Sequence, residues 1–148
     1  MIPESAPHLY QSFWTEFIAY CKSTKSTLHL PQSAPRRKYL PFAIGRTGFS
    51  VVADIDRGSA QVECTLWILK AKAPTFSELS FRETIVWKLH EKLGRVLFAE
   101  SPGGRAFKVF EFRPCDLSGH QERAAAHKWL KEHCESYVSV FTPIVKDL

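Results

Sequence analysis

The chain has 148 residues, 45% hydrophobic content and a formal net charge of +5, values typical of one soluble domain over residues 1–148 with a single core. No run approaches about 18 uninterrupted apolar residues, so we exclude a membrane-spanning helix. The start of the sequence lacks the basic flank and apolar centre of a secretory signal, and we therefore expect a cytoplasmic protein.

The first predicted element is an amphipathic helix over residues 9–21, because apolar side chains recur there at the spacing of one helical face. The following stretch, STKSTLHLPQSAPRRK, is rich in Ser, Thr and Pro and is typical of a surface loop. This loop brings three basic residues, Arg36, Arg37 and Lys38, to the start of the next element.

Strand signals come next in YLPFAIG, FSVVADID and AQVECTLWILK, which are rich in β-branched and aromatic residues and are separated by GRTG and DRGS. They predict a three-stranded antiparallel meander. In the third strand Leu66 and its alternate neighbours share one face, whereas Glu63, Thr65 and Trp67 share the other. This pattern indicates a sheet with one buried side.

The GRTG sequence could bind a phosphate or simply turn the chain. A phosphate-binding loop of the Walker type leads into a helix and ends with Lys followed by Ser or Thr. GRTG leads instead into an alternating strand pattern. We therefore predict a hairpin turn in which Gly45 and Gly48 adopt positive backbone angles, and contact of Arg46 with an anion is the minor alternative.

One inserted helix is predicted after Pro74, because Phe81, Ile85, Leu89 and Leu93 recur every four residues. The strand sequences RVLFAE and RAFKVFEFR follow, joined by the tight-turn sequence SPGG. The predicted sheet therefore has about five strands.

The C-terminal segment predicts a long helix that opens at Ser118. Thr142 and Pro143 favour a restart, which makes PIVKDL a short closing turn. The fold class is therefore α+β: an antiparallel sheet of about five strands with an N-terminal helix, one inserted helix and a long C-terminal helix packed on one face. One core should contain Trp14, Phe17, Leu66, Ile85, Leu89, Leu130 and Phe141.

Basic residues are distributed unevenly. Between residues 20 and 72, nine Lys and Arg residues face three Asp and Glu residues, a local charge of +6, so the remainder of the chain carries −1. A localised basic surface suits a polyanion partner, although ordinary solubility produces the same count.

A nuclease of the restriction-enzyme type requires two acids and a lysine two residues beyond the second acid, in order to hold a metal and activate water. Asp54 and Glu63 suit the acids, but Thr65 stands where lysine is required. No serine or cysteine lies in a sequence typical of a nucleophile. We expect no catalytic residue and no cofactor.

Metal and disulfide sites are also not expected. His120, His127 and Cys134 share a helix face, but successive members are seven residues apart, about 10 Å along the axis, too far for one metal ion. We interpret the histidines as solvated or capping residues. The cysteines are expected to be buried thiols because no CxxC pair occurs. They are Cys21, Cys64, Cys115 and Cys134.

An ordered set of signatures runs through the chain: QSFWTEF, PFAIGRTGF, QVECTLWI, KLGRVLF, RAFKVFEFR and HKWLKEHCESYVSVFTPIVKDL. In these segments the chain resembles the bacterial domain of unknown function 4268 (DUF4268), over nearly all residues from about Gln11 onward. It departs from the common pattern between Phe76 and Trp87. Members of that family are often joined to, or encoded with, nuclease-like domains of restriction and defence systems. The resemblance implies an accessory role in nucleic-acid transactions and supplies no catalytic residue.

Two hypotheses follow. In the first, a non-catalytic module binds nucleic acid or a nuclease partner through a basic region whose residues we expect to converge. These residues are Arg36, Arg37, Lys38 and Arg46. In the second, the chain is a protein-interaction or homo-oligomerisation domain whose aromatic surface includes Trp67. An enzyme is the third alternative. A salt titration separates the first two, because electrostatic binding weakens steeply with salt and apolar contact does not.

Overall fold

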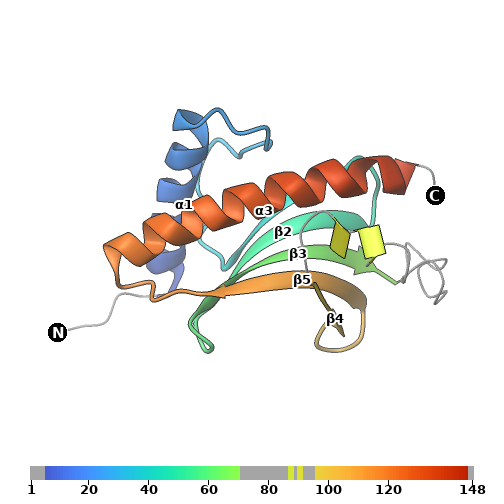
Figure 1. The fold of residues 1–148 in the computed structure, drawn as a ribbon. Coiled ribbons are helices and arrows are strands. Elements are labelled where there is room, and N and C mark those ends of the chain that lie inside the picture. Colours follow the sequence, from blue (N-terminus) through green and yellow to red (C-terminus); the bar gives the residue numbers. More distant parts are fainter. Residues whose placement is uncertain (1–5, 71–86, 89, 92–95, 147–148) are drawn as a thin grey trace.

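The computed structural model describes residues 6–70, 87–88, 90–91 and 96–146, which form a five-stranded antiparallel sheet and two helices (Figure 1). The helices are α1 (Ala6–Ser23) and α3 (His120–Lys146). The strands are β1 (Tyr39–Ala43), β2 (Phe49–Asp56), β3 (Gln61–Leu69), β4 (Leu97–Glu100) and β5 (Ala106–Pro114). Their order across the sheet is β1-β2-β3-β5-β4, so the predicted α+β class is confirmed.

The predicted meander is confirmed in β1, β2 and β3, which pair antiparallel in chain order. The GRTG sequence joins β1 to β2 as a turn, with φ of 89° at Gly45 and 92° at Gly48. These positive angles favour glycine over residues that carry a Cβ atom. The sequence therefore serves as a hairpin connection.

Strand β5 lies beside β3 and places β4 at the second edge of the sheet. The SPGG sequence between them turns with positive φ at both glycines, as its composition predicts. Most of the predicted inserted helix, including Ile85 and Leu89, lies outside the described residues. Within that segment the structure describes residues 87–88 and 90–91, which are helical.

The predicted restart of the last helix is wrong, because α3 continues through Pro143. Proline lacks the N–H that would donate to the carbonyl of Ser139, four residues earlier. Ser139 is exposed, so water can hydrate that carbonyl. Phe141 and Val145 are buried on the two sides of the proline, and their packing holds this part of the helix against the core.

Helix α3 runs across one face of the sheet, over β2 and β3, while α1 crosses α3 near its start (Figure 1). We call the sheet face beneath α3 the inner face. Alternate residues of β2 point to it and are buried. Five of the predicted core residues are fully buried in one cluster; they are Trp14, Phe17, Leu66, Leu130 and Phe141.

The four cysteines are free thiols and all are buried, as predicted. Cys134 on α3 contacts Cys64 on β3 with a sulfur–sulfur distance of 3.6 Å. Burial raises the pKa of the Cys21 thiol to about 11, so its reactive thiolate form is scarce near neutral pH.

Strand β1 forms one edge of the sheet. The N–H of Ile55 donates to the carbonyl of Lys38 at 2.9 Å, and antiparallel alternation then directs the backbone groups of Leu40 toward β2 and those of Pro41 toward the edge. Because proline has no N–H, the missing donor lies at the edge and no ladder hydrogen bond is lost.

Candidate functional site

The face of the sheet opposite α3, which we call the outer face, is the candidate site. Among the described residues, no helix or strand lies over it (Figure 1). Alternation and the strand register place the following side chains on it: Tyr39, Pro41, Ala43, Ser50, Val52, Asp54, Glu63, Thr65, Trp67, Leu69, Leu97, Ala99, Lys108, Phe110 and Phe112.

Much of the outer face is apolar. Four of its large side chains are more than a third exposed: Phe112 at 45%, Tyr39 and Leu97 at 39%, and Leu69 at 38%. Trp67 and Phe110 are half-buried between them. The solvent side of an antiparallel sheet usually carries polar residues, so this face is unlike an ordinary solvated surface.

Charged residues cross the middle of this apolar surface. Asp54 on β2 lies directly opposite Glu63 on β3, which brings their Cβ atoms to about 4.5–5.5 Å. Lys108 on β5 places its Nζ 3.9 Å from Glu63 Oε1 and 4.9 Å from the ring centre of Phe110. The lysine side chain therefore extends along the face from β5 toward Glu63 and past Phe110, the residue opposite Thr65.

The environment of Asp54 disfavours its charged form. Burial raises the pKa of its carboxyl to about 6; Lys38 and Lys108 oppose that rise and the charge of Glu63 adds to it. Asp54 Oδ1 and Thr65 Oγ1 are buried and have no hydrogen-bond partner among the described residues. This part of the face therefore holds a carboxylate oxygen that needs a donor and a hydroxyl that can also accept one.

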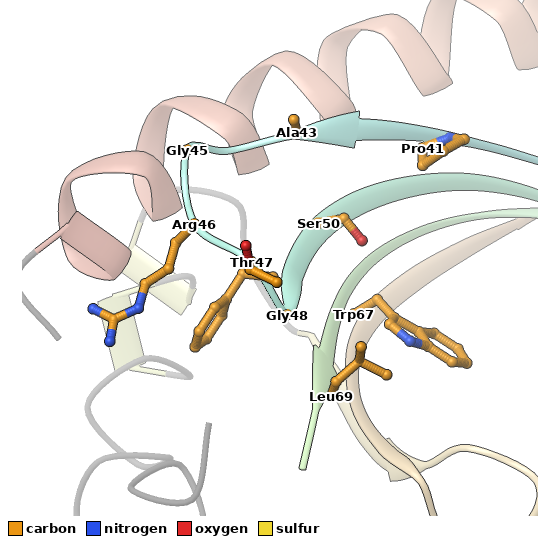
Figure 2. A pocket seen from close by; sticks show the side chains of 10 residues that line it. Pro41, Ala43, Gly45, Arg46, Thr47, Gly48, Ser50, Trp67 and Leu69 are labelled. Atoms are coloured by element: carbon orange, nitrogen blue, oxygen red, sulfur yellow. The ribbon is translucent and has the colours of Figure 1, made fainter. Parts of the chain in front are cut away.

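An open hollow of about 610 Å³ lies at one end of the outer face, between the GRTG turn and β3. Trp67 and Leu69 on β3, Ser50 on β2, and Pro41 and Ala43 on β1 line it together with the turn (Figure 2). The hollow is therefore a mainly apolar extension of the same surface.

One family pattern, Domain of unknown function (DUF4268), matches residues 9–145. The chain belongs to the DUF4268 family. A comparison with curated proteins finds no match. Two solved structures are similar to this DUF4268 domain: a chain of the HopA1–SchA chaperone–effector complex and YbjN, a putative transcription regulator from E. coli. The first has 10% identity and a TM-score of 0.41 over 90% of this chain and 99% of that chain. The second has 11% identity and a TM-score of 0.41 over 89% and 92%.

The predicted basic region of the DUF4268 domain is divided in two. Arg36, Arg37 and Lys38 are exposed before β1, and Arg46 lies beyond its other end, so the structure does not bring Arg46 together with the other three. The guanidinium of Arg37 lies over the ring of Tyr39 at 4.4 Å. Binding of nucleic acid by these residues stays a prediction.

Arg46 and Trp67, two residues singled out from the sequence, both line the hollow, but their side chains diverge (Figure 2). The Nη1 group of Arg46 donates to the carbonyl of Val145 at 3.2 Å, near the end of α3. A cation at this position stabilises the carbonyl end of a helix. Arg46 therefore ties the turn to α3.

The contribution of β5, where Lys108, Phe110 and Phe112 join the outer face, was not predicted from the sequence. A signal was present, because RAFKVFEFR has large apolar residues on both sides of the strand. The prediction of solvated or capping histidines is wrong for His127. That ring is buried, with its Nε2 3.1 Å from the carbonyl of Phe13.

Two classes of site find no support in the described part of the chain. No group of three or more His, Cys, Asp or Glu side chains there could hold a metal ion. No helix there is long and apolar enough to cross a membrane.

Proposed function

We propose that this DUF4268 domain is a protein-interaction domain and that a protein partner binds its outer face. The observation that carries the proposal is the exposure of Tyr39, Leu69, Leu97 and Phe112 on one face of the sheet. In the strand register Trp67 and Phe110 lie near Leu69, Leu97 and Phe112, while Tyr39 lies across Asp54 and Glu63 from Phe112. Several exposed large apolar side chains gathered on one face are typical of a protein–protein contact.

The side chains on this surface are of the types that contribute most to protein interfaces. Trp and Tyr are enriched among the residues whose truncation weakens binding, and aromatic residues are enriched across interface cores. Polar residues, among them Ser50 and Lys108, lie between and beside the apolar ones. We therefore expect Trp67 and Phe112 to be the main contacts.

Charge favours a protein over nucleic acid as the partner. A nucleic-acid surface carries one phosphate charge for each nucleotide and is bound by clustered Lys and Arg. The outer face instead presents three carboxyl groups on β2 and β3, those of Asp54, Asp56 and Glu63. The exposed basic run at residues 36–38 lies before the strand, at the margin of this face.

Site-specific photocrosslinking tests the proposal. A benzophenone amino acid replaces Phe112 in the full chain, which is expressed in cells of its source organism and irradiated. We expect one or a few discrete protein adducts that disappear when Leu69→Ser is added. The matched control places the same crosslinker at Lys128, an exposed residue of α3.

The control position should give no such adducts. Equal adducts at both positions, or none at Phe112, would reject the outer face as the interaction surface.

A further inference from the structure

The outer face contains a polar notch, which we define as Asp54, Glu63 and Thr65. Asp54 and Glu63 are direct neighbours across β2 and β3, and Thr65 follows Glu63 on the same side of β3. Glu63 is 8% exposed and Thr65 is 2% exposed. Apolar side chains flank the notch on both sides, with Tyr39 on β1 and Phe112 on β5.

The notch offers acceptors that its neighbours leave unsatisfied. Thr65 Oγ1 and Asp54 Oδ1 have no hydrogen-bond partner among the described residues. The cations near the notch are Lys38 and Lys108. Lys108 approaches Glu63 only to 3.9 Å, which is beyond hydrogen-bond distance.

Asp54 Oδ1 and Thr65 Oγ1 are already shielded from solvent, and a partner that covers the apolar surface would also remove the water that reaches the rest of the half-buried Asp54 carboxylate. An acceptor that is buried without a donor loses its hydration and gains nothing in return. A wholly apolar partner would therefore bind poorly, and an acidic one would be repelled by the two carboxylates. The partner must bring donors to this position.

We propose that the partner places an arginine side chain in the notch, with apolar residues beside it on the flanking aromatic side chains. The proposal rests on the proposed function. Arginine has five N–H donors in a planar fork and no acceptor, which matches acceptors spread over two strands. Hydrogen bonds from a guanidinium to a carboxylate are shorter and stronger than neutral ones. A lysine presents a single compact charge, a role that Lys108 already fills beside Glu63.

Phenethylguanidinium is a probe with both required features, an aromatic group and a guanidinium. Its neutral analogue, phenethylurea, has a similar shape and lacks the charge. Each is titrated into the full chain, and the backbone amide signals of residues 54, 63 and 65 are followed by NMR. We expect saturable shifts with the guanidinium compound and an affinity at least about tenfold weaker with the urea.

Two variants localise the binding. Asp54→Asn should weaken phenethylguanidinium binding at least about fivefold. Asp56→Asn is the matched control, because Asp56 lies two residues along the same strand and its Oδ1 already accepts from the N–H of Ser59 at 3.1 Å. The control should bind like the unchanged chain.

The outcomes separate this inference from the proposed function. Equal affinity for the two compounds, or no saturable shift with either, overturns the proposal that an arginine binds the notch. Crosslinking at Phe112 can still support the proposed function in that case. A concentration-dependent dimer in sedimentation, lost in Phe112→Ser, would assign the face to a second copy and overturn the arginine-bearing partner. Absence of crosslinks at Phe112 rejects the proposed function itself.

Discussion

The two faces of the sheet are built from alternate residues of the same strands, yet they differ in burial. On β3, Leu66 and Ile68 point to the inner face and are fully buried under α3. Trp67, between them in sequence, points to the outer face and keeps part of its surface in solvent. The inner face therefore stabilises the fold, while the exposed apolar side chains of the outer face can change with little effect on stability and remain available for binding.

The largest expected contrast comes from one phenylalanine on each side. Phe141 on α3 is fully buried over the inner face, whereas Phe112 on the outer face is 45% exposed. Phe141→Ala should lower the free energy of unfolding by about 3 to 5 kcal/mol, the usual result for a buried phenylalanine. Phe112→Ala should lower it by less than about 1 kcal/mol. Urea unfolding of both variants measures this, and equal losses would contradict the distinction between the faces.

Acid should weaken the core through His127. Burial lowers the pKa of this ring to about 4, and Arg123 adds to that effect, while the contact with the Phe13 carbonyl opposes it. Between pH 6.5 and 4 the unfolded chain binds a proton that the folded chain does not, so stability falls as pH falls. The lowering of the His127 pKa from 6.5 to about 4 corresponds to a loss of roughly 3 kcal/mol in the free energy of unfolding at acidic pH.

The measurement is the free energy of unfolding in urea from pH 8 to pH 4. His127→Gln keeps a donor and removes the titration, so its stability should change less over this range. His120→Gln, at an exposed position, serves as the control. Identical pH profiles for all three chains would show that His127 is not the responsible group.

The outer face should respond to pH in the opposite direction. Because the folded-state pKa of Asp54 is raised to about 6, the folded chain holds this proton more tightly than the unfolded chain. The stability that comes from this tighter proton binding is fully present below pH 3.8 and is lost as pH rises through 6. Asp54→Asn should therefore stabilise the domain at pH 8, on the order of 1 to 2 kcal/mol after allowance for partial exposure.

Thermal unfolding at pH 8 and pH 4 tests the change at Asp54, and the gain should nearly vanish at pH 4. A loss of stability at pH 8 would contradict the unfavourable burial of this carboxylate. If Asp54→Asn is more stable at pH 8 and also binds phenethylguanidinium more weakly, the native Asp54 carboxylate lowers stability and strengthens binding.

The smallest effect is expected at the basic run. Changing Arg36, Arg37 and Lys38 together to Glu should alter the free energy of unfolding by no more than about 0.5 kcal/mol, since all three are exposed. The proposed function predicts no salt-sensitive binding to DNA or RNA by the unchanged chain, whereas the nucleic-acid hypothesis predicts such binding. Binding that weakens steeply with salt and is abolished by the triple change would restore the nucleic-acid hypothesis.

Local patterns predicted most of the fold. Helical spacing predicted α1 and α3, and the glycines of GRTG predicted the first hairpin, because each signal lies within a few residues of the structure it determines. Pro143 misled the prediction, since the packing of Phe141 and Val145 outweighs one lost hydrogen bond. The family resemblance is confirmed over residues 9–145.

The site was harder to predict because it depends on which strands become neighbours. Asp54 and Glu63 were noticed as a pair, and the structure places them opposite each other. Lys108 joins them only because β5 pairs with β3, although Lys108 comes 45 positions after Glu63 in the sequence. Nothing in the sequence near Glu63 indicates that contact.

The proline at the middle of β1 determines how the sheet can grow. A strand from another molecule that added to this edge would find no N–H at Pro41, so the new ladder would be interrupted at its centre. The other edge, β4, has only four residues, Leu97–Glu100. Edge-to-edge pairing is a common route to fibrillar aggregation, and both edges discourage it. The domain can therefore display an apolar sheet face to a partner with a reduced risk of polymerising through its backbone.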